Sequence, residues 1–532
     1  FNIFTFVTVG SDKKKKLCED LGANVVINYK KEDFYKLCRK FEVPSGPVRT
    51  VDEVVEDDQL RFRDFFTSIK FHDGESYLVP GIGCLLSKTP AKRDLLVPKK
   101  NNSLQQARVS GEQLATGVSA VNSKRNSTLF AGPLQGIRVL DMGWVWAGAI
   151  PGQILADMGA EVIKVESTKR IDYMRLGRPL IDSEPDIEQN PWFHAVNRNK
   201  KSITVNLKSS AGVETLKKLV KECDAVIENF KPGFLAKLDM DYRSLSKINP
   251  SIVMLSMSGV GQTGPLSDIP AYAPFLSGLS GLDSLVGYPK EGILGIQQPY
   301  ADTNAGVTGA FGLLTALLHR KRSGEGQHVD LAETEAAISV IGEAFVHYAM
   351  TKSVPGPQGN FCQGYAPCGH YPTRGKDAWI SIAVESDQQW SNLCKILRQP
   401  HLAVSSSFLT KELRTQNRFA LDEELAELTK MQDTETFFEA LQADGIPAMP
   451  LLGPNEILQN AHFIQRGTFL KIDHPVLGEE AIFGPMWRQL NTSTENWAHA
   501  PLLGQHTLQI MTEVLGMTKN EVDELMLAEA LI

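Results

Sequence analysis

The sequence predicts an α/β protein: a Rossmann-like large domain with a parallel sheet, accompanied by a smaller α+β domain. From residue 133 onward, short apolar strands alternate with helices, a pattern typical of a parallel sheet that is covered on both faces. A Pro- and Gly-rich break at 355–360 is followed by a fresh strand over 379–384 and further helices, which indicates the second domain. The first 130 residues fit neither pattern.

Composition bounds the class of protein. The chain has 532 residues, of which 42% are hydrophobic and 22% charged, as is ordinary for a globular enzyme with a large core. A net charge of −7 argues against nucleic acid as a partner, and no apolar run reaches the ~18 residues needed to cross a bilayer. The cysteines form no CxxC pairs, so no metal site is expected. We expect a soluble protein, of the cytoplasm or the mitochondria.

Residues 1–42 are predicted to form a partial nucleotide-binding-like fragment. A strand over 3–9, a helix through Leu17 and a strand over 24–28 follow one another. The segment resembles the second half of a nucleotide-binding unit in medium-chain quinone reductases, in which Ser11 and the nearby lysines would face an NADP 2′-phosphate. The glycine-rich turn that should bind the phosphate first is absent. An NADPH-dependent reductase or nucleotide-binding module is therefore kept only as an alternative function.

Residues 43–98 look like a truncated copy of the chain's own C-terminal segment. Pro44-Ser-Gly-Pro47 aligns with Pro447-Ala-Met-Pro450 at an offset of 403 residues. At the same offset four further identities occur: Glu53 with Glu456, Arg63 with Arg466, Phe66 with Phe469 and Ile69 with Ile472. An internal repeat of this kind indicates duplication. Residues 99–130 are polar and lack periodicity, which is typical of a linker.

The large domain is predicted over residues 131–350 and the small domain over residues 351–453. No strand of the large domain is followed by GxGxxG, so classical dinucleotide binding is disfavoured. A long helix is expected over 332–351, and the small domain is expected to contain helices near 388–397 and 421–441. The strands expected in the large domain cover residues 137–141, 161–165, 203–207, 224–228 and 252–256.

Asp302 is the candidate catalytic residue. Pro299 ends the preceding segment, and apolar residues then recur at helical spacing without a proline up to Arg322, which predicts a helix with Asp302 at its N-cap. The orphan amides and the helix dipole at that position favour an ionised carboxylate by ~0.3–1 kcal/mol. An unpaired carboxylate is a possible nucleophile; the plain alternative is that Asp302 only caps the helix. Glycines recur every third residue along this helix, at Gly306, Gly309 and Gly312.

Several motifs occur in the order found in one enzyme family. Together with the Asp302 segment, the sequence from about Gly132 to the C-terminus resembles the class III CoA-transferases of CaiB/BaiF type, which include carnitine dehydratase and formyl-CoA transferase. The motifs that carry the resemblance are Leu134–Asp141, Leu155–Glu166, Glu228–Gly233, Ser258–Pro265 and Gly504–His506.

The resemblance implies a domain arrangement and an oligomeric state. The small domain is inserted before the chain returns, over residues 454–532, to the large domain, and two chains form an interlocked homodimer. Residues 43–98 are then a truncated copy of a CoA-transferase C-terminal segment that lacks any counterpart of Asp302.

The resemblance also implies a reaction. The family transfers coenzyme A from an acyl-CoA to a carboxylic acid, with CoA as co-substrate and no permanently bound cofactor. Asp302 would attack the thioester and pass through covalent intermediates. By their places in the motifs, CoA contacts are expected at Val145, Lys208, Asn229, Phe230 and Lys237. The last stands where the formyl-CoA branch has an arginine, and both lysines are equally consistent with ordinary surface charges.

Other positions decide between related functions. Ala271-Tyr272-Ala273 stands where many relatives have Gly-Tyr-Asp and the racemase branch has Gly-His-Asp. Because racemisation needs a second acid or base, a 2-methylacyl-CoA racemase is kept as an alternative. Lys169 or Arg170 is expected to replace the basic residue that some relatives place directly after Glu166. Candidate substrate contacts in the small domain are Tyr365, His370 and Tyr371.

Overall fold

A computed structural model describes most of the chain. The described residues are 6–9, 11–21, 23–28, 31, 37, 38, 40, 43, 45–71, 74–91, 132–176, 186–361, 364–487 and 497–532; the predicted linker over 99–130 lies outside them. The chain divides into two compact units. The first comprises residues 1–286, 293–356 and 470–532, and the second comprises 287–292 and 357–469.

The first unit is organised around a twisted sheet. In the described residues this sheet has seven strands in the order β5-β13-β10-β9-β6-β7-β8. Strand β5 pairs antiparallel with β13 at one edge, and the other strands run parallel to one another. Their bounds are Cys84–Leu86 for β5, His328–Ala332 for β13, Val253–Ser258 for β10, Ala225–Glu228 for β9, Arg138–Met142 for β6, Glu161–Glu166 for β7 and Lys201–Thr204 for β8.

The strand order is that of a doubly wound fold. The chain runs from β6 outward through β7 to β8, then returns to the other side of β6 and continues through β9 and β10 to β13. The direction of winding therefore reverses between β6 and β9, which defines the topological switch point. This confirms the predicted Rossmann-like parallel sheet. The predicted strand over 203–207 lies two to three residues earlier in the structure, as β8.

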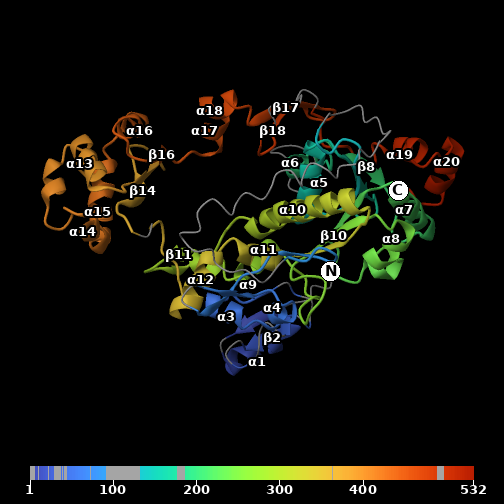
Figure 1. The fold of residues 1–532 in the computed structure, drawn as a ribbon, viewed down its shortest axis with the longest axis horizontal. Helices are drawn as coiled ribbons and strands as arrows, with labels where there is room; N and C mark the ends of the chain where they lie inside the picture. Colours follow the sequence, from blue (N-terminus) through green and yellow to red (C-terminus); the bar gives the residue numbers. More distant parts are fainter. Residues whose placement is uncertain are drawn as a thin grey trace. The chain divides into compact units, whose positions relative to one another are not determined.

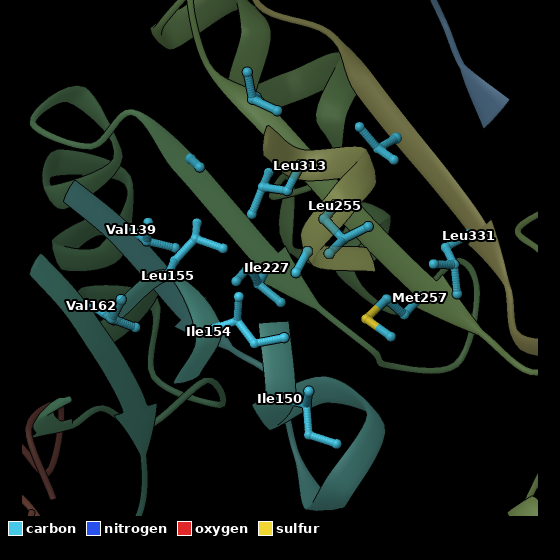
Figure 2. Packing of buried hydrophobic residues seen from close by; sticks show 14 of the residues in the cluster. Val139, Ile150, Ile154, Leu155, Val162, Ile227, Leu255, Met257, Leu313 and Leu331 are labelled. Atoms are coloured by element: carbon cyan, nitrogen blue, oxygen red, sulfur yellow. The ribbon is translucent and has the colours of Figure 1, made fainter. Parts of the chain in front are cut away.

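Helices cover both faces of the sheet. On one face α5 (Val145–Asp157) and α10 (Tyr300–Ser323) pack against the strands; Figure 2 shows Ile150, Ile154 and Leu155 of α5 among Val139, Ile227 and Leu255 of the sheet. The other face is covered by α7 (Ser210–Lys221), α8 (Tyr242–Ile248), α19 (Thr507–Glu513) and α20 (Lys519–Leu527). Successive strand residues alternate between the two cores, as the period of two requires.

Helices α5 and α10 lie side by side because α10 presents glycines to its neighbours (Figure 1). A Cβ added at Gly306 would lie 2.6 Å from Cβ of Ile150 on α5. Additions at Gly309 and Gly312 would lie 3.1 Å from Leu255 and 3.0 Å from Val329 of the sheet. The three glycines thus let α10 approach both α5 and the strands, and this contact holds the start of α10 in place.

The N-terminal part of the first unit contains two small groups of elements. Strands β1 (Phe6–Val9) and β2 (Val25–Asn28) pair in parallel around α1 (Asp12–Asp20), the strand-helix-strand order expected there. Helices α3 (Val51–Val55) and α4 (Asp58–Phe62) are followed by the hairpin β3 (Thr67–Lys70) and β4 (Ser76–Val79), and then by β5. Figure 1 shows α3 beside α12 (Gly342–Thr351), against which it packs.

The prediction of one helix over 332–351 is wrong in two respects. The segment forms two helices, α11 (Glu333–Ser339) and α12, and its first residue, Ala332, belongs to β13. The break falls at Val340 and Ile341, where two β-branched residues precede Gly342, and all three lower helix propensity. The remaining elements of the first unit are α6 (Pro191–Asn197), η1 (Leu235–Leu238), α9 (Ala273–Leu279), η2 (Asp283–Leu285) and β18 (Gly478–Phe483), which forms a hairpin with β17. The division between the units falls within β12 (Gly292–Ile293) and after the first residue of β17 (Phe469–His474).

The second unit has its own sheet and core. Strands β14 (Cys368–Pro372), β15 (Trp379–Ala383) and β16 (Ala448–Pro450) pair antiparallel, and Trp390, Leu421 and Leu441 belong to the core beneath them. The predicted helix over 421–441 is two helices because Asp433 caps the second one with its side chain. The other elements are β11 (Gly287–Tyr288), α13 (Asp387–Ile396), η3 (Pro400–Val404), α14 (Lys411–Gln416), α15 (Arg418–Thr429), α16 (Thr434–Ala443), α17 (Pro454–Gln459) and α18 (Ala461–Gln465).

Length and apolarity together exclude a membrane crossing for every helix in the described ranges. The predicted domain boundaries at 42, 98, 130, 350 and 453 stay predictions.

Candidate functional site

The carboxyl edge of the parallel sheet gathers most of the residues singled out by the sequence. Strand β6 leads into Gly143–Val145, β9 into Asn229 and Phe230, and β13 into Glu333. Parallel strands end at one edge, and ligands of doubly wound sheets bind there, at the switch point between neighbouring strands. In this sheet the switch point lies between β6 and β9, so Val145, Asn229 and Phe230 follow the two strands that flank it.

Asp302 lies in the first turn of α10, not at its N-cap as predicted. The helix begins at Tyr300, with Pro299 at the N-cap position, where no side chain caps the helix. Proline favours the start of a helix because its missing N–H group would be unpaired there in any case. Within the described residues, no cation forms an ion pair with the Asp302 carboxylate. Asp302 is therefore a carboxyl group in the first turn of a helix whose charge is not neutralised by any described cation.

Burial dominates the ionisation of Asp302. It raises the pKa of Asp302 to about 6, against the direction expected from the helix dipole. Glu333, at the start of α11, is 7% exposed; burial, and then the charge of Asp302, raise its pKa well above the ordinary value. Both shifts favour a state in which Asp302 alone is charged, since two neighbouring carboxyl groups with little solvation do not both ionise readily.

A hydrogen bond between α10 and α11 fixes the backbone close to Asp302 and Glu333. The side-chain amide of Asn304 on α10 donates to the carbonyl oxygen of Ala336 on α11 at 2.9 Å. The sequence analysis missed Glu333 because it placed the residue inside a long helix. The signal that identifies it is an acid directly after the strand β13 (His328–Ala332), at the edge where a parallel sheet binds its ligands.

Asn229 holds the loop at the switch point. Its side-chain oxygen accepts from the Trp144 N–H at 2.8 Å, and its amide donates to the Trp144 carbonyl oxygen at 3.0 Å. The next residue, Val145, has a φ of 57°, which is unusual for a β-branched residue. Its N–H donates to Asp172 at 3.3 Å, and Asp172 is in turn 3.2 Å from the buried Lys164 ammonium. The structure thus brings Val145 and Asn229 close together, because the Asn229 side chain holds the backbone of Trp144, the residue before Val145.

Phe230 is half-buried beside Phe234, with ring centroids 5.0 Å apart. Its N–H donates to the buried Glu228 carboxylate at 2.9 Å, and burial raises the pKa of Glu228 to about 7. Lys208, after β8, and Lys237, in η1, are both exposed. Neither lysine forms an ion pair with any residue that the structure describes, so both ammonium groups are available to an anionic ligand.

Arg170 places a cation beside the loop at the switch point. Its guanidinium carbon lies 4.7 Å from the centroid of the Trp144 ring, in the loop held by Asn229. Lys169, the other expected replacement, lies 3.3 Å from Glu529 instead. Glu166 itself is buried and paired with Arg175 at 2.8 Å. Among the described residues, no group of three His, Cys, Asp or Glu side chains is placed to hold a metal ion.

The remaining residues that the sequence singled out differ in their solvent exposure and in whether their polar groups already have partners. Tyr272 is 59% exposed, whereas Ala273 is buried in α9. In the second unit the buried Tyr371 hydroxyl donates to Asp422 at 2.6 Å, so its polar end is occupied. His370 is exposed and lines a hollow of about 750 Å³. Tyr365 is half-buried, with the Lys411 ammonium 5.9 Å from its ring centroid.

Comparison with known proteins identifies relatives that cover most of the chain. The model of CoA-transferase family III matches residues 8–103 and 134–507. The succinyl-CoA–D-citramalate CoA-transferase of Chloroflexus aurantiacus is 33% identical over 392 residues, which cover 73% of this chain and 96% of that protein. The succinyl-CoA:glutarate CoA-transferase of Mus musculus is 32% identical over 398 residues, covering 74% of this chain and 89% of that protein.

A solved structure is similar to this chain as well. A CaiB/BaiF family protein from Brucella suis superposes with a TM-score of 0.67 at 32% identity, covering 72% of this chain and 99% of that one. The first stretch matched by the family model begins at residue 8, and the resemblance of residues 1–42 to quinone reductases stays a prediction.

The Glu333→Gln variant is expected to change how stability depends on pH. The pKa of Glu333 is raised on folding, so its favourable contribution is complete below the unfolded value of about 4.5 and is lost as pH rises toward the folded value. Glutamine cannot ionise. The free energy of unfolding of the variant, measured by urea denaturation, should therefore gain on that of the wild type between pH 4.5 and pH 8. A difference that does not change with pH would contradict a raised pKa at Glu333.

Proposed function

Because this chain belongs to CoA-transferase family III, we propose that it transfers coenzyme A from an acyl-CoA donor to a carboxylic acid acceptor, with Asp302 as the covalent nucleophile. The observation that carries this proposal is the position of Asp302, which lies in the first turn of α10 and forms no ion pair with any cation that the structure describes. A carboxylate without a cationic partner among the described residues, with a pKa of about 6, is charged at neutral pH and only weakly solvated, and both properties favour nucleophilic attack.

The proposed reaction proceeds by successive acyl exchanges through the Asp302 carboxyl group. A carboxylate oxygen of Asp302 attacks the thioester carbonyl carbon of the donor; the C–S bond breaks, leaving a mixed anhydride and the CoA thiolate. The thiolate attacks the Asp302 carbonyl carbon and releases the donor acid as its carboxylate, which gives an aspartyl–CoA thioester. The acceptor carboxylate then attacks that thioester and the released thiolate takes up the acceptor acyl group, restoring Asp302. No proton or electron is gained or lost overall.

The raised pKa of Glu333 supports this sequence. Each step passes through a negatively charged tetrahedral intermediate at the Asp302 carboxyl group or at the acyl carbon bound to it. A second ionised carboxylate beside it would oppose that charge. Burial and the charge of Asp302 raise the pKa of Glu333, which favours its neutral form while Asp302 is charged. Polar groups that are placed in advance lower the barrier most where water is excluded.

We propose that CoA binds at the switch point, where it meets cationic and aromatic groups. CoA carries phosphoryl groups at its nucleotide end and an adenine ring. Arg170, Lys208 and Lys237 supply exposed cations for phosphates, and the Phe230 ring supplies an apolar face for the base. The loop of Val145, fixed by Asn229, lines the same edge. CoA enters and leaves as a co-substrate, and this chemistry uses no permanently bound cofactor.

The relatives suggest the substrates. The citramalate, glutarate and malate enzymes are all named for succinyl-CoA as donor. We propose succinyl-CoA as the donor and a short dicarboxylic acid as the acceptor, to be tested with a panel of acids against succinate exchange. The racemase and reductase alternatives gain no support from the described residues. The interlocked homodimer stays a prediction.

The Asp302→Asn variant tests the nucleophile. Asparagine keeps the size of the side chain but cannot form the anhydride, so CoA exchange should fall at least ~1,000-fold. Intact-mass analysis after incubation with succinyl-CoA should show a CoA-sized adduct on the wild-type peptide that contains Asp302, and none on the variant. Thr303→Ala, on the exposed side of the same turn, is the matched control and should retain both. A variant that is still active, or an adduct on another peptide, would refute the role of Asp302.

The pH profile tests the ionisation of Asp302 independently. Attack requires the carboxylate, and the pKa of this group is about 6. The value of kcat/KM should therefore be constant above pH 7 and fall about tenfold per pH unit well below 6. If the profile stays flat down to pH 4.5, Asp302 has an ordinary pKa and the environment inferred for it is wrong.

Substitution of the two free lysines tests the CoA site. Lys208→Ala and Lys237→Ala should each raise KM for the acyl-CoA roughly three- to tenfold with little change in kcat, since a phosphate contact stabilises substrate and transition state alike. Lys247→Ala is the control, because this exposed lysine lies at the end of α8, toward the opposite edge of the sheet. Dephospho-CoA thioesters should show a smaller effect at whichever lysine binds the 3′-phosphate. Equal effects at all three positions would indicate only a general charge effect.

A further inference from the structure

The loop over residues 143–145, between β6 and α5, has a backbone shape that its own residues do not favour. Val145 is β-branched, yet its φ of 57° lies in the left-handed region, where a Cβ atom crowds the backbone. A Cβ added at Gly143 would lie 2.1 Å from the carbonyl oxygen of Gly148. Trp144 stands at the N-cap position of α5, and its side chain does not cap the helix. The shape of this loop therefore depends on support from other parts of the chain.

Charged side chains beneath the loop supply that support. Asp141 of β6 accepts a hydrogen bond from the N–H of Gly143 at 2.9 Å. The ammonium group of Lys164, on β7, donates to the carbonyl oxygen of Gly143 at 2.8 Å. The carboxylate of Asp172 accepts from the N–H of Val145 at 3.3 Å. Three charged groups thus bind the two ends of the loop.

Two of these groups, Lys164 and Asp172, form an ion pair inside the protein. The ammonium nitrogen lies 3.2 Å from the Asp172 carboxylate, and the two side chains are 0% and 2% exposed. Burial alone would lower the pKa of Lys164, but the charges of Asp172, Asp141 and Glu166 outweigh burial and raise it, so Lys164 stays charged. Packed apolar residues often stabilise a fold as well as a buried ion pair does. The particular contribution of this pair is direction, because each partner binds one defined backbone group of the loop.

The same ion pair joins the loop after β6 to the segment after β7. Asp172 belongs to that second segment, where its carboxylate also accepts from the N–H of Met174 at 3.0 Å. In the same segment, the Arg170 guanidinium lies over the Trp144 ring. The ring of Tyr173 meets the Trp144 ring edge-on, with centroids 6.5 Å apart. The two loops are therefore fixed to each other by one buried ion pair below and by ring contacts above it.

We propose that Lys164 and Asp172 are positioning residues for CoA, which fix the loop of Val145 and the cation of Arg170 relative to each other at the switch point. This inference rests on the CoA site proposed above. Both side chains are enclosed by protein, so they act through the groups that they hold. Strands β6 and β7 are parallel neighbours, so the segments that follow them meet one ligand at the same edge. Groups that are held in advance lose little freedom on binding, which favours affinity.

Substitution of the pair separates positioning from folding. Asp172→Asn keeps the shape of the side chain but removes the charge that faces Lys164. The KM for succinyl-CoA should rise roughly tenfold while kcat falls less than about threefold, because the displaced groups bind CoA and do not react. Lys164→Met/Asp172→Asn removes both charges and should regain most of the thermal stability that the single variant loses. Its KM should stay raised roughly fivefold or more, because the carbonyl oxygen of Gly143 has lost its donor.

Asp157→Asn is the matched control. Asp157 is the last residue of α5 and forms a buried ion pair with Arg198, at the end of the helix away from the loop. Its substitution should lower the melting temperature about as much as Asp172→Asn does, and leave KM for succinyl-CoA unchanged. If Asp172→Asn raises KM no more than the control, or if the double variant recovers the wild-type KM, the pair is only structural and the proposal is overturned.

Hydrogen exchange of the wild-type chain does not depend on the folding of a variant. Calorimetry first measures the binding of CoA, and exchange is then followed with the site saturated. CoA should slow the exchange of amides in 143–149 and in 170–174 together, by roughly threefold or more, because the ion pair joins the two segments. Protection of only one segment by bound CoA would overturn the positioning role and leave the CoA site standing. Absence of CoA binding would refute the proposed site itself, and this inference with it.

Discussion

The parallel strands of the main sheet end at one edge, and every chemical argument about this protein depends on that constraint. Residues that are 188 positions apart, such as Val145 after β6 and Glu333 after β13, lie at the same edge because their strands run in the same direction. The reversal of winding between β6 and β9 then leaves space between the loops that follow these two strands. The glycines of α10 complete the arrangement, since they allow this helix, which begins at the same edge, to lie against α5 and the strands.

Desolvation gives this edge its reactivity. In water both Asp302 and Glu333 would be ionised at pH 7. Burial makes a charge on either group costly: it raises the pKa of Asp302 to about 6 and, together with the charge of Asp302, raises the pKa of Glu333 well above its ordinary value. The helix dipole at the start of α10 acts in the opposite direction but is worth less than burial. The fold therefore makes both carboxyl groups weaker acids than they would be in water.

The sequence predicted the sheet, its parallel character and the residues that follow its strands, because these features depend on local alternation and on short turns. Val145 and Asn229 were expected separately, and the structure joins them through Trp144. Helix breaks were predicted less well: the break before Gly342 and the cap at Asp433 were missed because the apolar periodicity continues across both. Glu333 was missed for the same reason. Its ionisation depends on burial by segments distant in sequence, which a local pattern does not contain, and the same holds for the partners of Arg63.

The duplicated segment and the candidate site meet in one helix turn. Arg63, in residues 45–91, pairs with Glu335, two residues from Glu333 in the first turn of α11. Without the charge of Arg63, Glu335 would be a further buried carboxylate close to Glu333, which is costly in a poorly solvated turn. The N-terminal segment therefore supplies a charge on which the first turn of α11, and with it the position of Glu333, depends.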